Sequence, residues 1–326
     1  MMSQQDYPWR SLSASRNTII SDAIKVEGSK HAFYWAKSHE GLPQLICKLP
    51  EAVSLNEVLP NFNGITAQLV EAGGECLLVT QLTDLTFEQL FHHLCLNLIE
   101  STRSADCATA IVIVIVGRLK RWQKLMGKKS VPGMLTRQEQ QGLMGELIFL
   151  RDMLFDWTSY RQAVACWVAP DEHPQDFALP GPTSVEVKCR QTTSPDMVKI
   201  SSAWQLHQED GNIVLAVLAL GKGNEGSAGH FTLASLVEDI RKILSASPDA
   251  SELFEDALFG WGYIDLAEYN VTWWQVASWR AYGVDGSFPK LTVPDLKQGI
   301  VDVSYRLSLP DCSQWELDIQ NLKSAF

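Results

Sequence analysis

The stretch DFALPGPTSVEVKCR, residues 176–190, decides how the central part of this chain of 326 residues folds. It consists of two short strand-like segments joined by the turn-forming sequence PGPT, a pattern typical of a β-hairpin. In the second segment, SVEVKCR, strand alternation places Glu186 and Lys188 on one face and the two valines on the other. We therefore expect polar chemistry on one face of this strand and apolar packing on the opposite face.

Two carboxylates and one ammonium should meet in this hairpin. Asp176 precedes Glu186 by ten residues and starts the partner strand, so pairing brings both acids and Lys188 to one end of a sheet. Phosphodiester hydrolysis uses such a set: carboxylates hold Mg²⁺, the metal activates a water, and lysine stabilises charge developing on the phosphate. The spacing D-x9-E-x-K also occurs on ordinary strands with one solvated polar face, so both interpretations stay open at this point.

A third acid, Glu146, falls on the apolar side of a predicted helix. The helix begins with the capping box Thr136-Arg-Gln-Glu139, and Leu143, Leu147 and Leu150 surround Glu146 on that side. A carboxylate buried there needs a partner. It is either an additional metal-binding or water-orienting ligand of the same centre, or one half of a salt bridge to a core lysine or arginine.

The order of predicted elements divides the chain into three regions. Residues 1–132 mix short strands with helices into an α+β region. Residues 133–246 run helix, three strands, helix, strand, helix, which predicts an α/β (α+β) core with a central mixed sheet flanked by helices. Residues 247–326 contain aromatic strand segments and predict a β-rich region. Further predicted elements are a helix from Thr86, a helix rather than a strand at Ala110–Val116, a strand at Ala163–Val168 and a short helix at Ser202–Gln208.

Composition limits the class of protein. The apolar share of 46% and the charged share of 20% are typical of globular proteins. The seven cysteines are scattered without a CxxC pair, which favours reduced thiols in a cytosol. The first residues lack the basic start and apolar core of a secretory signal, and no apolar run approaches the roughly 20 residues that span a bilayer. We expect a cytoplasmic protein without a membrane segment.

The charge distribution bears on nucleic-acid binding. A net charge of −11 argues against a protein that binds nucleic acid through its whole surface. Six basic residues and no acid lie between positions 118 and 129, whereas the last 76 residues carry eleven acids and five bases. The basic run, with Lys120, Arg121 and Lys124 as candidate DNA-binding residues, is either a DNA contact or a solvated helix face. DNA binding should therefore use a local patch or a partner protein.

Two glutamines are weaker candidates. Gln205, in the segment SSAWQL, either faces the catalytic centre as an accessory residue or caps a helix or sheet edge. Gln191 either orients a phosphate or ends its strand in solvent. The glycines at 221–226 do not form a P-loop, because the lysine precedes the pattern and no GK[ST] occurs. We expect no nucleotide-hydrolysing motor.

The strings GLMGELIFL, QDFAL, SVEVKCRQ and ISSAWQL, in this order, resemble a bacterial family of PD-(D/E)XK motif proteins associated with restriction-type and phage-defence gene clusters. The resemblance extends from GRLKRWQKLM to FPKL and covers most of the chain. It implies a restriction-endonuclease-like core in which Glu146, Asp176, Glu186 and Lys188 match the catalytic positions. Asp176 and Glu186 would be the ligands of Mg²⁺, for which Mn²⁺ can substitute. The sequence departs from the motif at Gln175, which replaces the proline.

These patterns predict a Mg²⁺-dependent DNA endonuclease of a restriction or phage-defence system. Its partners would be DNA and other subunits of that system, and a homodimer would suit double-strand cleavage because one centre cuts one strand. The alternative is a non-cleaving scaffold or DNA-recognition subunit that retains the nuclease fold. The complete Asp/Glu/Lys set favours the enzyme, and the acidic net charge favours dependence on partners in either case.

Overall fold

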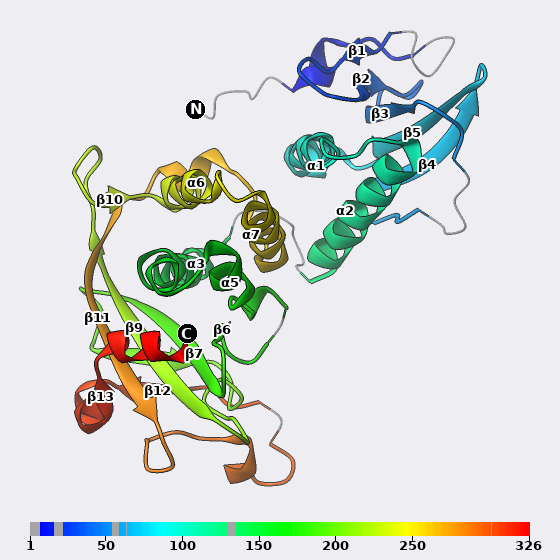
Figure 1. Cartoon of the computed structure of the whole chain (residues 1–326). Coiled ribbons are helices and arrows are strands. Elements are labelled where there is room, and N and C mark those ends of the chain that lie inside the picture. Colours follow the sequence, from blue (N-terminus) through cyan, green and yellow to red (C-terminus); the bar gives the residue numbers. More distant parts are fainter. Residues whose placement is uncertain are drawn as a thin grey trace. The chain divides into compact units, whose positions relative to one another are not determined.

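The computed structural model describes residues 7–15, 22–53, 59–62, 64–128, 135–171, 173–300 and 302–326, and only the backbone of 124–128. The chain divides into two compact units, Met1–Gly133 and Met134–Phe326 (Figure 1). The region 247–326, which the sequence separates from the core, lies in the second unit. Its strand β11 (Trp274–Val284) pairs with β9 (Asn212–Lys222) in the core sheet. The predicted third region is therefore part of the same compact unit as the core.

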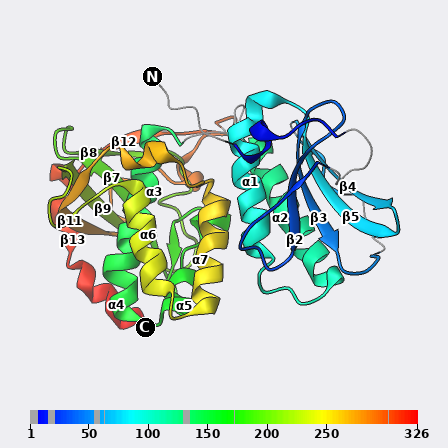
Figure 2. The ribbon, with the colours of Figure 1, turned by 90° about the horizontal axis from the view of Figure 1, so that it is seen from above.

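The first unit is an antiparallel sheet in the order β1-β2-β3-β5-β4, and helices α1 and α2 lie on one face of it (Figure 2). Most side chains of the inner strands β3 and β5 are buried. Its elements are β1 (Ile24–Lys25), β2 (Ala32–Lys37), β3 (Pro43–Leu49), β4 (Ile65–Ala72), β5 (Glu75–Leu82), α1 (Glu88–Ser101) and α2 (Ala108–Lys128).

Helix α2 contains the apolar run whose periodicity favours a helix over a strand. Ile111, Ile115, Leu119 and Trp122 are all buried, and they recur at the spacing of one helix face. Helical periodicity over several turns therefore outweighs the β-branched composition of the run. Within the part of the chain that the structure describes, no helix is both long and apolar enough to cross a membrane.

The start of α1 differs from the prediction. Asp84, rather than Thr86, acts as the cap, because its side chain accepts a hydrogen bond from the Thr86 backbone N–H at 2.9 Å. A short 3₁₀ turn, Leu85–Phe87, follows this cap, and α1 begins after it at Glu88. Asp caps helices at least as well as Thr, so the acid two residues earlier takes the role.

The second unit contains the predicted mixed sheet flanked by helices. Its strand order is β10-β11-β9-β7-β6, with β13 beside β11; β7 and β9 run parallel and the other pairs are antiparallel. Helices α3, α5, α6 and α7 lie on one side of this sheet (Figures 1 and 2). The remaining elements are α3 (Arg137–Phe149), α4 (Phe155–Trp157), α5 (Tyr160–Ala165), β6 (Phe177–Ala178), β7 (Thr183–Gln191), β8 (Met197–Ile200), β10 (His230–Phe231), α6 (Leu233–Leu244), α7 (Pro248–Trp261), β12 (Tyr305–Ser308) and β13 (Glu316–Leu317).

The register between β7 and β9 decides which β7 side chains share a face. Glu186 lies opposite Leu215 and Lys188 opposite Val217. Leu215 and Val217 belong to a buried cluster to which the paired strands β8 and β12 contribute. Glu186 and Lys188 therefore point to the face covered by β8 and β12.

The other face of β7 packs against α3. At Gly145 a Cβ would lie 3.2 Å from the Cβ of Cys189 and 3.3 Å from a methyl group of Val187. Glycine suits this position because a Cβ would lie in tight contact with both side chains, so α3 approaches the sheet closely here. The predicted alternation of polar and apolar faces along β7 is thus the observed one.

Two predicted elements are wrong in type. Residues 160–165 form helix α5 rather than a strand, because Ser159 caps the helix by accepting the backbone N–H of Gln162. Only Trp167, after the helix, makes an isolated β-bridge, to Phe177. The segment 202–208 forms turns rather than a short helix.

The region 247–326 is also less β-rich than predicted, because α7 occupies its first part. Pro248 at the first helical position suits a helix start, and Gly262 ends the helix with a left-handed φ of 97°. Phe254 and Leu258 bury its apolar side. The sequence contains both helix-end signals, Pro248 and Gly262. The prediction followed the aromatic residues of the region instead.

Candidate active site

Asp176, the residue that precedes β6, lies beside Glu186 of β7. Strand β6 pairs with β7 so that Phe177 faces Val185, and extending this register by one residue puts Asp176 opposite Glu186. Opposite residues of an antiparallel pair share a face, with Cβ atoms roughly 4.5–5.5 Å apart. The Asp176 carboxylate is also held by the backbone N–H of Val187, which donates to it at 2.7 Å. The hairpin therefore brings the two predicted acids together.

Lys188 completes this cluster. Its Nζ donates to Oε1 of Glu186 at 2.6 Å, and the Glu186 side chain is 0% exposed. The second carboxylate oxygen, Oε2 of Glu186, is buried without a hydrogen-bond partner among the described residues. An unpaired buried oxygen of this kind is costly. It is a natural position for a positively charged ligand.

Glu146 reaches the same cluster from helix α3. Its Oε2 accepts hydrogen bonds from the indole N–H groups of Trp167, at 2.7 Å, and Trp261, at 2.8 Å. Its pKa responds to the charges of both Asp176 and Glu186, so it lies near them. Among the described residues, the hydrogen-bond partners of this buried acid are thus two neutral indoles rather than a lysine or an arginine.

The sequence analysis did not find these two tryptophans. They stand 21 and 115 positions from Glu146, in the segment after α5 and at the end of α7. The only signal in the sequence was the buried acid itself, which requires donors of some kind.

Burial raises the pKa of all three carboxyl groups. For Glu146, burial and then the charge of Asp176 hold the pKa well above its usual value, against the lowering effect of the indole hydrogen bonds. For Glu186, burial and the charge of Asp176 raise the pKa to about 8, although Lys188 opposes them. For Asp176, burial raises the pKa more than Lys188 lowers it. The surrounding side chains therefore do not fully stabilise the negative charges of Glu146, Asp176 and Glu186.

The pKa of Lys188 is also raised, but by charge rather than by burial. Burial by itself would lower its pKa, but the charges of Glu186 and Asp176 outweigh burial, and the pKa is raised. Lys188 therefore keeps its proton at neutral pH and remains a fixed positive charge beside the two acids.

The donor set fits a divalent cation. Mg²⁺ in proteins is commonly held by one or two carboxylates, with waters in the other positions. Asp176 and Glu186 supply two carboxylates, and the unpartnered Oε2 of Glu186 is one oxygen that can bind the ion. Among the described residues, no group of three or more His, Cys, Asp or Glu side chains is arranged to hold a metal. A metal here would rely on these two carboxylates and on water.

Gln175, at the position of the motif proline, anchors a neighbouring loop. Its side chain is buried, and its Nε2 donates to the backbone carbonyls of Trp204, at 2.9 Å, and His207, at 3.2 Å. Gln205 in that loop accepts the Ser201 backbone N–H on its side-chain oxygen at 2.7 Å. The Gln205 side chain therefore holds the turn of its own loop, and its accessory role at the catalytic centre stays a prediction.

The candidate DNA-binding residues lie in the first unit. Lys120 and Arg121 are exposed on α2, and the side chain of Lys124 lies outside the described side chains. The four residues of the carboxylate cluster belong to the second unit. The basic run and the cluster are therefore features of different compact units.

Comparison with known proteins identifies the family. The family model described as "Putative PD-(D/E)XK family member, (DUF4420)" matches residues 6–310, which include both units and all four residues of the carboxylate cluster. No curated protein and no solved structure matches the chain. The chain therefore belongs to the PD-(D/E)XK family DUF4420.

Proposed function

We propose that this chain is a cytoplasmic, Mg²⁺-dependent DNA endonuclease of a restriction or phage-defence system. The observation that carries the proposal is the cluster in which the half-buried carboxylate of Asp176 and the buried one of Glu186 meet the ammonium of Lys188. A buried oxygen without a donor in that cluster supports a bound cation. Membership of a PD-(D/E)XK family supports the nuclease class.

The catalytic roles follow from the positions of these side chains. Mg²⁺ held by Asp176 and Glu186 would supply a water of lowered pKa and polarise the scissile phosphate, and Mn²⁺ can replace it. The Lys188 ammonium, oriented by its hydrogen bond to Glu186, stabilises negative charge that develops on the phosphate. This stabilisation is stronger than it would be in water, because the ammonium lies in a site that is largely shielded from solvent.

Glu146 is a positioning residue in this scheme. Its carboxylate joins α3 to the end of α7 and to Trp167 through the two indole hydrogen bonds. It also adds negative potential beside Asp176, which favours a cation over an empty site. In this scheme Glu146 does not contact the phosphate. It holds α3, α7 and Trp167 in place and adds negative charge to the metal site.

The proposal is tested with the full chain and DNA in supercoiled, linear, methylated and unmethylated forms. Cleavage should require Mg²⁺ or Mn²⁺ and stop when EDTA removes the metal. Nicks alone would mean one centre acting on one strand, whereas double-strand breaks would support two copies acting together. Cleavage that is unaffected by EDTA would overturn the metal-dependent mechanism.

Metal binding should be linked to pH. The pKa of Glu186, about 8, lies above its ordinary value of 4.5, so its proton contributes stability that is complete below the unfolded-state pKa. That stability is lost as pH rises through about 8. Because Mg²⁺ competes with this proton, the rise in Tm on adding Mg²⁺ should be larger near pH ~9 than near pH ~6. Scanning fluorimetry with and without Mg²⁺ measures both effects.

Asp176→Asn is the matched variant for this measurement. The substitution removes one proposed metal ligand and one of the neighbouring negative charges. The Tm increase with Mg²⁺ should shrink, and the metal-free protein should be as stable as the wild type or more stable, because carboxylate repulsion is relieved. An equal Mg²⁺ effect in both proteins at both pH values would contradict the proposed site.

The basic run of α2 is a proposed DNA contact. Replacing Lys120, Arg121 and Lys124 together with alanine should weaken DNA binding to a similar degree for all sequences. The slope of log K against log salt should become shallower by about 1 for each phosphate that the variant no longer neutralises. Fluorescence anisotropy at several salt concentrations measures both quantities.

A matched control removes three bases from the acidic C-terminal region, Lys290, Lys297 and Lys323. This triple alanine variant should bind DNA like the wild type, because eleven acids against five bases in the last 76 residues make that region a poor phosphate contact. If both triple variants bind alike, the run on α2 serves solubility rather than DNA binding.

A non-cleaving scaffold or DNA-recognition subunit is the second candidate function. The net charge of −11 favours it, because so acidic a chain depends on a local patch or on partners to approach DNA. The discriminating experiment reconstitutes the chain with the products of neighbouring genes. If that assembly cuts DNA equally well with the wild type and with Lys188→Ala, cleavage belongs to another subunit.

A further inference from the structure

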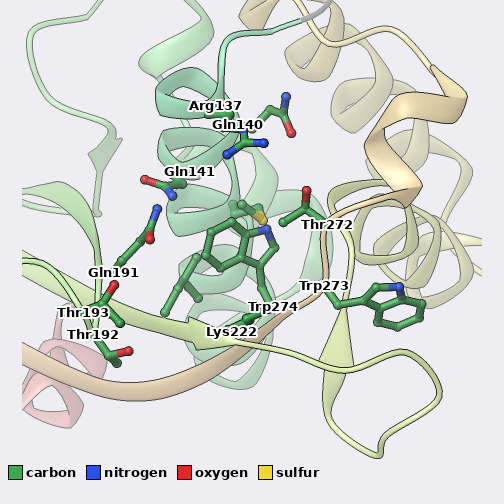
Figure 3. A pocket seen from close by; sticks show the side chains of 12 residues that line it. Arg137, Gln140, Gln141, Gln191, Thr192, Thr193, Lys222, Thr272, Trp273 and Trp274 are labelled. Atoms are coloured by element: carbon green, nitrogen blue, oxygen red, sulfur yellow. The ribbon is translucent and has the colours of Figure 1, made fainter.

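A pocket of about 260 Å³ (Figure 3) lies on the face of β7 opposite to the face that carries Glu186 and Lys188. It is formed by the start of α3, the ends of β7 and β9, and the start of β11. Gln191 of the lining lies opposite Leu220, on the face that packs against α3, whereas Lys188 points to the β8–β12 face. The pocket is therefore a separate site, and the proposed endonuclease mechanism does not use it.

The lining combines an aromatic surface with amide groups. The half-buried indole of Trp274 lies in the middle of it, and the amide ends of Gln141 and Gln191 point toward one another beside this indole (Figure 3). Met144 and Leu220 are buried and supply apolar surface. Each amide offers both donors and acceptors, which matches the mixed hydrogen-bonding edge of a nucleobase.

Two cationic side chains, Arg137 and Lys222, also line the pocket. Both are exposed, and neither forms an ion pair with an acid in the described ranges. Arg137 is the first residue of α3, where the positive end of the helix dipole disfavours a cation. A cation kept in this unfavourable position, in a pocket that a second cation also lines, favours an anionic ligand.

We propose that this pocket binds a single nucleotide. The base would lie against Trp274, with its polar edge at Gln141 and Gln191, and the phosphate would be held by one of the two lining cations, Arg137 or Lys222. Stacking on an aromatic side chain is the usual way in which proteins hold an unpaired base. A volume just under the ~300 Å³ at which small-molecule sites begin suits one nucleotide and excludes a duplex.

Two sources can supply this ligand chemistry. One is a free nucleotide, and the other is a nucleotide of the DNA strand turned out of its stack, as enzymes that read single bases require. Both present the same base and phosphate to the pocket. The experiment therefore has one arm for each source.

The first arm uses isothermal titration calorimetry of the full chain with each deoxynucleoside monophosphate, with EDTA present so that no cleavage interferes. At least one should bind, and Trp274→Ala should weaken that binding about tenfold or more. Trp273→Ala is the matched control, because the Trp273 indole at the rim turns away from the other lining side chains (Figure 3). The control should bind like the wild type.

The second arm compares a short duplex that carries one unpaired nucleotide with the fully paired duplex. If the ligand comes from DNA, the wild type should prefer the first duplex and Trp274→Ala should lose the preference. If Trp274→Ala does not fold, the exposed pair Arg137→Ala with Lys222→Ala replaces it in both arms. Binding that is absent, or equal in the pocket variant and in Trp273→Ala, overturns the proposal. The first arm uses free nucleotides and EDTA, so its outcome does not depend on cleavage, and failure of cleavage and failure of this pocket are distinguishable.

Discussion

Replacing Lys188 with alanine should lower metal-dependent DNA cleavage by roughly a thousand-fold or more, which is the loss that follows removal of one preorganised charge-stabilising group. The ammonium is buried, carries its proton at neutral pH and is oriented at 2.6 Å by Glu186. Without it, only the bound metal would offset the charge that develops on the phosphate. Rates of plasmid cleavage at saturating Mg²⁺ measure the effect.

The fold should survive this substitution. Removing one partner of a buried ion pair leaves an uncompensated charge, which is costly, but the raised pKa of Glu186 shows that this carboxyl takes up a proton readily. Lys188→Met keeps the apolar stem and should match the alanine variant in activity and exceed it in Tm. Lys199→Ala, an exposed lysine on the neighbouring strand β8, is the control and should cleave normally. A Lys188→Ala variant that retains cleavage within tenfold would sink the catalytic assignment.

Replacing Glu146 with alanine should destabilise the protein by about 2–4 kcal/mol. The carboxylate accepts both indole hydrogen bonds, from Trp167 and Trp261. Its loss leaves a buried N–H on Trp167, a half-buried one on Trp261 and a small cavity between α3 and α7. Urea unfolding of the metal-free protein measures the change in the free energy of unfolding.

Glu146→Gln separates structure from charge. The glutamine oxygen can accept the same indole hydrogen bonds, and the neutral side chain removes repulsion with Asp176. Its free energy of unfolding should equal or exceed that of the wild type. If this stable variant cleaves DNA more slowly, the loss comes from the missing negative charge of Glu146 and not from a damaged fold. Equal stability of the alanine and glutamine variants would show that the indole bonds do not anchor α3.

Local patterns in the sequence predicted the elements that carry the site. Alternation within SVEVKCR placed Glu186 and Lys188 on one face of β7, and the observed register agrees. The capping box at Thr136 begins α3 as predicted, and the helical spacing of Ile111 and Ile115 gave the correct type for α2. These features depend on hydrogen bonds and periodicities that span a few residues, so a short window of sequence contains them.

Local patterns failed where neighbouring signals competed. The segment 163–168 has strand-like composition, yet the cap at Ser159 makes residues 160–165 helical. The aromatic residues of 247–326 suggested a separate β-rich region, but α7 forms within it and β11 joins the core sheet. In β11, which pairs with β9, Ala281, Tyr282 and Val284 are buried, and a distant strand can supply that stabilisation without a trace in the local sequence.

The sequence by itself determined that Asp176, Glu186 and Lys188 could meet, because one hairpin contains all three. Only the tertiary structure decided the partners of Glu146, whose indole donors stand 21 and 115 residues away. It also decided the nucleotide-sized pocket, which needs α3, β7, β9 and β11 together. Hydrogen bonds and pockets between distant segments exist only after long-range packing has fixed those segments, so no spacing in the chain encodes them directly.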